Sequence, residues 1–120
     1  MELKFRIRKT GADPHVTVID LEGGMLSSDV SVFNDELEQL LLQKENRVII
    51  NLKNLDFIGS SGIGTIMFTA DKLKKRNGEL AIVGMNEEIR NVFDHLGLGK
   101  FVTVYETEQE AVRAFRSTGE

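Results

Sequence analysis

The stretch Leu55-Asp56-Phe57-Ile58-Gly59-Ser60-Ser61-Gly62-Ile63-Gly64 connects an apolar run to an amphipathic helical pattern. The apolar run covers residues 47–52, and the helical pattern extends from about Ser61 to Arg76. Together they predict a strand, a loop and a helix. The loop is rich in glycine, so its backbone can turn tightly and approach other groups closely. Its two hydroxyl groups lie where the helix begins.

Two roles are open to a serine at the start of a helix. Ser60 or Ser61 can accept a hydrogen bond from an unpaired first-turn amide and act as an ordinary cap. Alternatively, the hydroxyl can point outward and accept a phosphoryl group, which would lie against the positive end of the helix. The pattern alone does not separate the two roles.

The region before this stretch predicts a hairpin followed by a helix. Leu3, Phe5 and Ile7 alternate with charged residues, which is typical of a half-buried strand. Residues 11–14 then turn the chain, and a second strand over residues 16–21 should pair back antiparallel. We expect Gly23 and Gly24 to end that strand. Residues 27–29 should supply the cap of a helix over residues 30–44.

Strands alternate with helices from residue 16 onward. The run 48–52 is apolar on both faces, which places it at the centre of a covered sheet. Further strands are predicted over residues 80–83 and 101–104, and further helices over residues 89–96 and 106–116. This alternation implies parallel neighbours joined by right-handed crossovers. We therefore predict one α/β domain over residues 1–120, with a mostly parallel sheet, an antiparallel first strand and about four helices.

Composition excludes several classes of function. The chain has no cysteine and only two histidines, so we expect no disulfide, metal site or cofactor. The net charge is −4 and no basic stripe is present, which argues against direct binding of nucleic acid. The N-terminal residues alternate polar and apolar, and no apolar run is long enough to cross a membrane. We expect a cytoplasmic protein with no membrane insertion.

Residues 51–64, Asn-Leu-Lys-Asn-Leu-Asp-Phe-Ile-Gly-Ser-Ser-Gly-Ile-Gly, resemble the STAS domain family and, within it, the bacterial anti-sigma factor antagonists. Members carry an apolar strand, a short polar link and an Asp-Ser-Ser/Thr/Ala-Gly-Leu/Ile-Gly motif that opens a helix. The resemblance extends over essentially the whole chain. It implies a STAS-like fold and a regulatory protein that is not an enzyme.

The resemblance also implies a phosphorylation switch. In the family, the serine of the motif is phosphorylated by a partner serine kinase that is itself the anti-sigma factor, and this serine corresponds to Ser60. The unphosphorylated protein binds that partner and so frees the sigma factor for transcription. The phosphorylated protein is released, and a serine phosphatase resets it. Ser61 is the neighbouring hydroxyl.

Two departures from the family pattern concern partner recognition. Gly59 stands where the family usually has aspartate. Any help that this carboxylate gives in orienting the acceptor serine or in contacting the partner is therefore absent. After Gly23, where many antagonists have acidic residues facing the partner, this chain has Gly24, Met25 and Leu26. We therefore expect the choice of partner to differ.

Helical geometry predicts a surface for the partner. Residues 63, 66, 67, 70 and 73 form the inward face of the helix, and Phe68 points about 160° away from its centre, because each residue advances about 100°. Phe68 should therefore be exposed, on the same side as the serines. The predicted partner-binding residues are Gly59, Ser60, Ser61, Gly62, Gly64, Thr65, Phe68, Gly24, Met25 and Leu26.

Alternatives of other classes remain open. The first is a STAS scaffold that works without phosphorylation, as an accessory subunit of a signalling or transport assembly. The second is a small domain that binds a nucleotide or other ligand, although the glycine spacing does not match the dinucleotide or phosphate-loop patterns. An enzyme is disfavoured because no set of base, nucleophile and orienting acid can be assembled. The sequence leaves open a weak homodimer and the identity of the kinase, phosphatase and sigma factor.

Overall fold

The computed structural model describes residues 2–10 and 15–118, with side chains up to residue 115. The elements follow one another along the chain as β1 (Lys4–Thr10), β2 (Val16–Met25), η1 (Ser27–Asp29), α1 (Val30–Leu42), β3 (Arg47–Ile58), α2 (Ser60–Lys75), β4 (Glu79–Val83), α3 (Glu87–His95), η2 (Leu98–Lys100), β5 (Thr103–Tyr105) and α4 (Glu108–Thr118). The two η elements are single turns of 3₁₀-helix.

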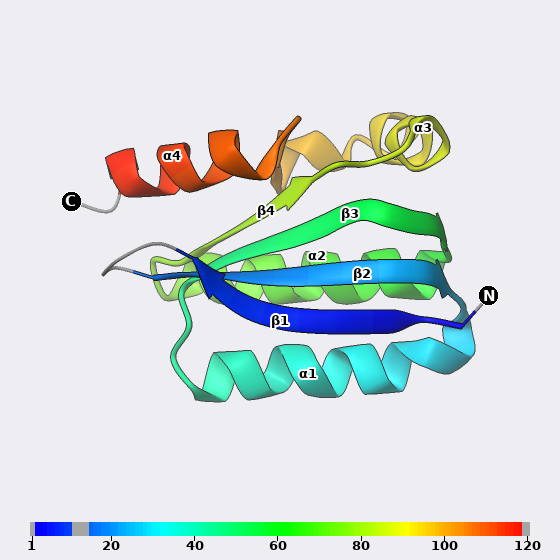
Figure 1. The fold of residues 1–120 in the computed structure, drawn as a ribbon, viewed down its shortest axis with the longest axis horizontal. Helices are drawn as coiled ribbons and strands as arrows, with labels where there is room; N and C mark the ends of the chain where they lie inside the picture. The colour runs from blue at the N-terminus through cyan, green and yellow to red at the C-terminus, as the bar shows by residue number, and fades with distance from the viewer. Residues whose placement is uncertain (1, 11–14, 119–120) are drawn as a thin grey trace.

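The strands form one mixed sheet in the order β1-β2-β3-β4-β5 (Figure 1). β1 pairs antiparallel with β2, and the other neighbouring strands pair in parallel. The prediction of an α/β fold with a mostly parallel sheet and an antiparallel first strand is confirmed. Within the described residues the fold has four α-helices, as expected.

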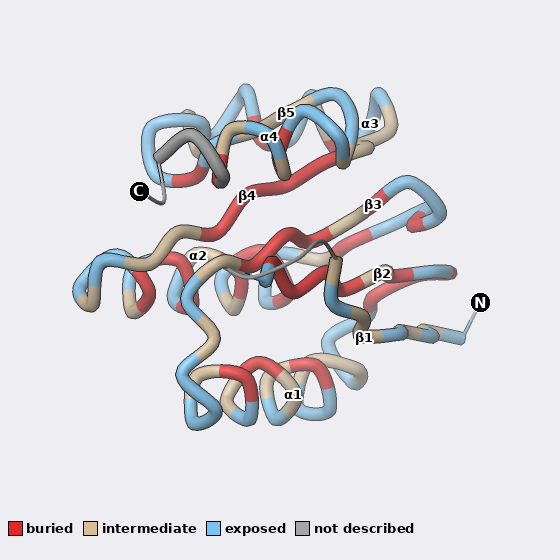
Figure 2. The backbone as a smooth tube through the Cα atoms, turned by 60° about the vertical axis from the view of Figure 1, so that its left-hand side comes forward, coloured by how far each residue is buried: buried red, intermediate tan, exposed pale blue. Residues whose placement is uncertain are grey.

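Helices cover both faces of the sheet. Side chains of α1 and α2 share the larger hydrophobic cluster with one face, and Ala111 and Phe115 of α4 share a second cluster with the opposite face. Adjacent residues such as Val48 and Ile49 belong to different clusters, as the alternation of a strand requires. Figure 2 shows buried residues concentrated in the central strands and on the inner sides of the helices. The first half of β3 is therefore buried on both faces.

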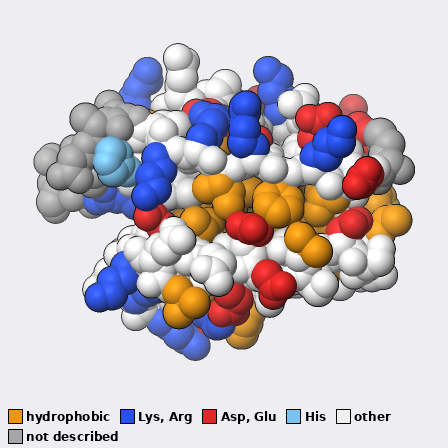
Figure 3. Space-filling view, turned by 60° about the horizontal axis from the view of Figure 1, so that its bottom comes forward, with side chains coloured by type: hydrophobic (Ala, Val, Ile, Leu, Met, Phe, Trp, Pro, Cys, Tyr) orange, Lys and Arg blue, Asp and Glu red, His pale blue; other side chains and the backbone are white. Residues whose placement is uncertain are grey.

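The outer margin of the larger cluster lies along β1 and α1. Phe5 and Ile7 of β1 and Leu3 just before it, with Val30 and Leu41, pack against this core while remaining partly exposed. In Figure 3, which turns the α1 side forward, hydrophobic side chains form a band across the middle of this face. The alternating pattern of the first strand thus predicted its half-buried state correctly.

β2 and β3 both extend further than their sequence patterns indicated. β2 continues through Gly23 and Gly24 to Met25, so the expectation that these glycines end it is wrong. Parallel pairing with β3 continues as far as Met25 and Ile58, across register shifts on either side of Gly23. Gly23 has a φ of 93°, a conformation that glycine adopts without strain. The glycines therefore bend the strand rather than stop it.

Other boundaries also differ. α1 ends at Leu42, and Lys44 has a φ of 63°, so the helix does not reach residue 44. The last strand begins at Thr103 rather than at Phe101. In the turn before α1, the Asp29 carboxylate accepts a 2.9 Å hydrogen bond from the Leu26 amide. The predicted turn over residues 11–14 lies outside the described residues.

Candidate functional site

The site is built at the junction of β3 and α2. β3 runs to Ile58 and α2 starts at Ser60, so Gly59 alone connects them, and the longer loop expected from the sequence is wrong. Gly59 is the N-cap residue and has an extended conformation, with φ −81° and ψ 170°. Its amide donates a 3.0 Å hydrogen bond to the Met25 carbonyl oxygen. The start of α2 is thereby fixed to the end of β2.

Both serines are exposed in the first turn of α2. Among the residues that the structure describes, no side-chain hydrogen bond caps this helix, so neither Ser60 nor Ser61 acts as an ordinary cap. The first backbone bond of the helix runs from the Ile63 amide to the Gly59 carbonyl, at 3.1 Å. Within residues 2–10 and 15–118, the amides of residues 60–62 therefore have no hydrogen-bond partner. Two free hydroxyls lie next to three free donors.

The electrostatic environment of this helix end favours an added anion. The first turn of α2 contains no acidic residue, and the last turn carries Lys72, Lys74 and Lys75. Negative charge is favourable near a helix N-terminus, whereas basic residues suit the opposite end. In the first turn, no acidic side chain therefore neutralises the positive end of the helix, and no basic side chain adds to it.

The glycines of the motif have different roles. A Cβ atom on Gly62 would lie 2.6 Å from Met25 Sδ and 3.0 Å from Ile58 Cγ1, so Gly62 allows α2 to pack closely on β2 and β3. A Cβ on Gly59 would be 3.7 Å from the Met25 carbonyl oxygen, an ordinary contact, and one on Gly64 would meet nothing within 4 Å. Position 59 therefore has room for the Cβ atom of a side chain.

The structure brings together only part of the predicted partner surface. Ser60, Ser61, Gly64 and Phe68 are exposed, and Gly59 and Thr65 are partly exposed. Gly24, Met25 and Gly62 are buried, so they do not lie on the accessible surface as we expected. The two glycines have no side chain and the Met25 side chain is flexible, so these residues pack closely beneath the start of the helix.

An apolar rim forms part of the same surface. Leu26, Phe57 and Phe68 are 52%, 50% and 56% exposed, respectively. The sequence pattern predicts a loop around Phe57 and so does not identify this residue; it lies in β3, and its ring is 3.9 Å from the position of a Cβ on Gly59. Exposed aromatic side chains near the serines are the features that a partner could contact.

Phe68 is held in place by charged neighbours. The Lys72 ammonium lies 4.4 Å from the centroid of the Phe68 ring, and the same ammonium is 3.2 Å from Glu38 Oε1 of α1. These contacts connect α2 to α1 on the side of the helix that carries Phe68. Nearer the serines, the Thr65 hydroxyl donates a 3.0 Å hydrogen bond to the Ser61 carbonyl oxygen.

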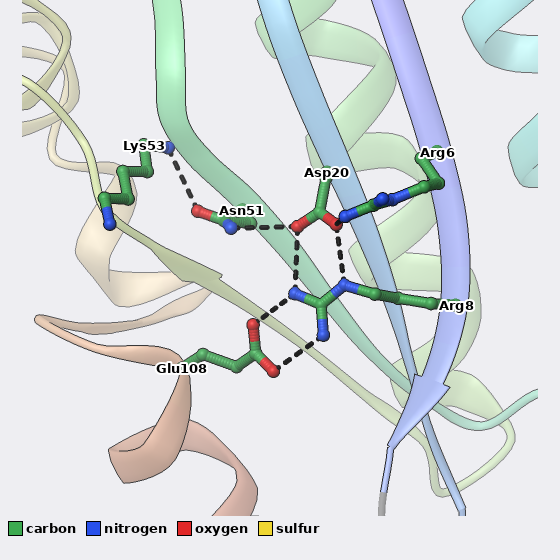
Figure 4. A network of polar contacts seen from close by, with 6 residues as sticks. All are labelled: Arg6, Arg8, Asp20, Asn51, Lys53 and Glu108. Carbon is green, nitrogen blue, oxygen red and sulfur yellow. Dashed lines mark hydrogen bonds and ion pairs between the residues drawn. The ribbon is translucent and has the colours of Figure 1, made fainter.

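A polar groove of about 750 Å³ lies beside the start of α4. Arg8 occupies its centre, where Nε donates to Asp20 Oδ2 at 2.6 Å and Nη1 donates to Glu108 Oε2 at 3.0 Å (Figure 4). Asn51 Nδ2 donates to Asp20 Oδ1 at 2.9 Å. Hydrogen bonding from Arg8 lowers the pKa of Asp20 below its usual value. These groups satisfy one another and tie α4 to β1 and β2.

Metal sites and membrane-spanning helices are not found in the part of the chain that the structure describes. No group of three or more His, Cys, Asp or Glu side chains there could hold a metal ion. None of the helices there has the length and apolar character needed to cross a membrane.

Comparison with known proteins shows similarity to one protein family. The model of the STAS domain family matches residues 7–111. The anti-sigma F factor antagonist of Paenibacillus polymyxa is 24% identical over 98 residues, which cover 81% of this chain and 84% of the relative.

Solved structures share the fold. An anti-sigma factor antagonist from Mycobacterium paratuberculosis aligns with a TM-score of 0.84 at 22% identity, over 96% of this chain and 95% of the other. The phosphorylated form of the Bacillus cell fate determinant SpoIIAA aligns with a TM-score of 0.72 at 24% identity, over 92% of this chain and 98% of the other. At these identities the likeness establishes the fold.

Proposed function

The chain belongs to the STAS domain family, and we propose that it is an anti-sigma factor antagonist. Phosphorylation of Ser60 controls its binding to its partner. The partner is an anti-sigma factor with serine kinase activity, and a separate serine phosphatase restores the bare form. The protein itself is a regulator rather than an enzyme and works in the cytoplasm, where sigma factors act. The relative from Paenibacillus polymyxa, named as such an antagonist, supports this proposal.

One observation carries the proposal: Ser60 is exposed beside three amides that lack hydrogen-bond partners within the described residues. A phosphoryl group on its oxygen would add a charge of about −1.5 to −2 and three acceptor oxygens. The amides of residues 60–62 could donate hydrogen bonds to those oxygens with little backbone movement. This arrangement supports a switch in which the same fold holds both the bare and the phosphorylated form.

The same modification would change what the surface can bind. In the bare form residues 57–68 carry no charged side chain, and the apolar side chains of Leu26, Phe57 and Phe68 border the helix start. A phosphate in this area is charged and strongly hydrated, so a partner that covers it must remove water from an anion. A partner complementary to the bare surface loses affinity, which releases the antagonist.

Phosphorylation is tested by intact-mass measurement after incubation with the cognate kinase and ATP. Wild type should gain one phosphoryl group and Ser60→Ala none. Ser61→Ala is the matched control, because it removes the neighbouring hydroxyl and leaves Ser60 in place, so it should be phosphorylated like wild type. Equal uptake by wild type and Ser60→Ala would remove Ser60 from this role.

Release is tested by titrating the anti-sigma factor into bare and phosphorylated protein in a calorimeter. We expect phosphorylation to weaken binding by at least about tenfold. Ser60→Ala should bind like the bare protein, since the alcohol itself is not needed for contact. Equal affinity of the bare and phosphorylated forms would contradict the switch.

The presence of Gly59 favours a second candidate, a scaffold that binds its assembly without phosphorylation. The side chain of the family aspartate is missing, although a Cβ atom at this position would make only ordinary contacts. If neither serine accepts phosphate from the cognate kinase while the partner still binds, the scaffold is the better account. A nucleotide-binding role would instead appear as a rise in melting temperature with millimolar nucleotide.

A further inference from the structure

An apolar pocket lies between the second half of α2 and η2, away from the serines. Its volume is about 320 Å³, and its lining is Met67, Ala70, Asp71, Lys74, Leu98 and Phe101. We call this surface the α2–η2 pocket. The lining contains no residue of the partner surface described above.

Phe101 projects beside this pocket and is 64% exposed. Its backbone is fixed, because its amide donates a 2.9 Å hydrogen bond to the carbonyl oxygen of Leu98, the first residue of η2. The ring belongs to neither hydrophobic cluster. A large apolar side chain beside an apolar hollow is typical of a surface that another molecule covers.

The charges on the rim indicate what covers it. Asp71 and Lys74 are both exposed and lie about one helical turn apart on α2. Asp71 also pairs with Lys75 of its own helix, at 3.1 Å, but both side chains are well exposed, so this pair is worth little. Antiparallel packing of two copies of α2 about a two-fold axis would place Asp71 of each copy opposite Lys74 of the other.

The pocket also contains both parts of an apolar contact. Phe101 is a projecting ring, and Met67 and Ala70 line the hollow. A two-fold interface uses the same patch on both subunits, so the patch must complement itself in shape and charge. The α2–η2 pocket carries a projecting ring beside a hollow and an acidic beside a basic side chain, which are the pairs that such a patch needs.

We propose that the α2–η2 pocket is a self-association surface, in which Phe101 of each copy enters the pocket of the other. A stable interface buries about 800 Å² on each partner, which exceeds one small pocket, so the dimer is weak, with a dissociation constant of roughly ten to several hundred micromolar. α2 rises about 1.5 Å per residue, which places Lys74 about 20 Å along the helix from Ser60. Both copies of the dimer therefore keep the serine end accessible.

A charge exchange tests the geometry. Sedimentation velocity from about ten micromolar to about one millimolar should show concentration-dependent dimer formation by wild type. Asp71→Lys and Lys74→Asp should each weaken the dimer at least about tenfold, because each places like charges opposite one another. The double variant should recover most of the affinity. A wild type that stays monomeric overturns the proposal, as do single variants without effect or a double variant no better than the single ones.

A second test follows the apolar contact. Phe101→Ala should remove most of the dimer, whereas Leu42→Ala, which truncates a 74% exposed side chain on α1, should not. Methyl-labelled methionine gives a residue-specific reading in NMR spectra. The Met67 signal should shift with protein concentration, and those of Met25 and Met85, which do not line the pocket, should stay fixed. A stationary Met67 signal, or a Phe101→Ala protein that dimerises like wild type, would contradict the assignment.

Discussion

The Gly59 amide donates a 3.0 Å hydrogen bond to the Met25 carbonyl oxygen, which joins the start of α2 to the end of β2. This bond uses the amide of the N-cap residue and leaves those of residues 60–62 without a partner within the described residues. The sheet thus sets the direction of the helix while its first turn stays free to bind an anion.

Close packing beneath this junction predicts opposite effects of alanine at two glycines of α2. Gly62→Ala should lower the free energy of unfolding by about 1–3 kcal/mol, because the new methyl group would lie 2.6 Å from Met25 Sδ in the core. Gly64→Ala should raise it by about 0.5–1 kcal/mol, since its methyl group meets open space and alanine favours the helix. Urea denaturation measures both. Equal changes in the two variants would show that Gly62 has no packing role.

Restoring the aspartate of the family pattern should strengthen the helix start. Gly59 has N-cap dihedral angles and space for a side chain, so Gly59→Asp should raise the free energy of unfolding by about 0.5–1 kcal/mol at neutral pH. Amide donors and the helix dipole should lower the pKa of the new carboxylate in the folded state. The gain should therefore be present above the unfolded pKa of about 4 and disappear as the pH falls through the folded pKa.

Gly59→Asn is the control for this charge effect. Its neutral side chain can cap the same amides, so its smaller gain should persist in acid. Unfolding curves of both variants at pH 7 and about pH 3 make the comparison. If the aspartate variant is no more stable than wild type at pH 7, the first-turn amides are not available to a capping group.

Phe68 should matter for binding rather than for folding. Phe68→Ala removes an exposed ring and its contact with Lys72, so the free energy of unfolding should change by less than about 1 kcal/mol. Affinity for the anti-sigma factor should fall at least about tenfold if Phe68 is a central contact. Phe101→Ala is the matched control, because it removes another exposed phenylalanine outside the partner surface. A similar loss of affinity in both variants would argue against a specific contact at Phe68.

The Arg8 network should account for part of the stability that the folded protein loses in acid. Hydrogen bonding to Arg8 lowers the pKa of Asp20 in the folded state, so its contribution is present above the unfolded pKa of about 4 and is lost as the pH falls through the folded pKa. Asp20→Asn should cost about 1–2 kcal/mol at pH 7 and flatten the loss of stability toward pH 3.

Asp56→Asn provides the comparison for this variant, because Asp56 is an exposed aspartate without an ion pair in the described part of the chain. It should change the free energy of unfolding by less than about 0.5 kcal/mol. Urea curves at pH 7 and pH 3 decide the matter. If the free energy of unfolding falls as steeply toward pH 3 in Asp20→Asn as in wild type, other groups control the loss of stability in acid.

Some of the site was readable from the sequence because it depends on local periodicity. The helical period of about 3.6 residues predicts Phe68 on the outside and Ile66 on the inside of α2, and the structure confirms both. The apolar run 48–52 identified the central strand through its own local pattern. Phe57 could not be recognised in this way, because residues 53–58 mix polar and apolar side chains without a regular alternation, and their pairing with β2 is what shows the strand.

The sequence by itself determined the order and type of the elements, the inward faces of the helices and the position of two hydroxyls at a helix start. These features follow from spacing along one chain, which local stereochemistry converts directly into structure. Only the tertiary structure decided that Gly24, Met25 and Gly62 lie beneath the surface and that neither serine caps its helix. Burial and the fate of each amide depend on strands and helices that are distant in sequence, so no local pattern encodes them.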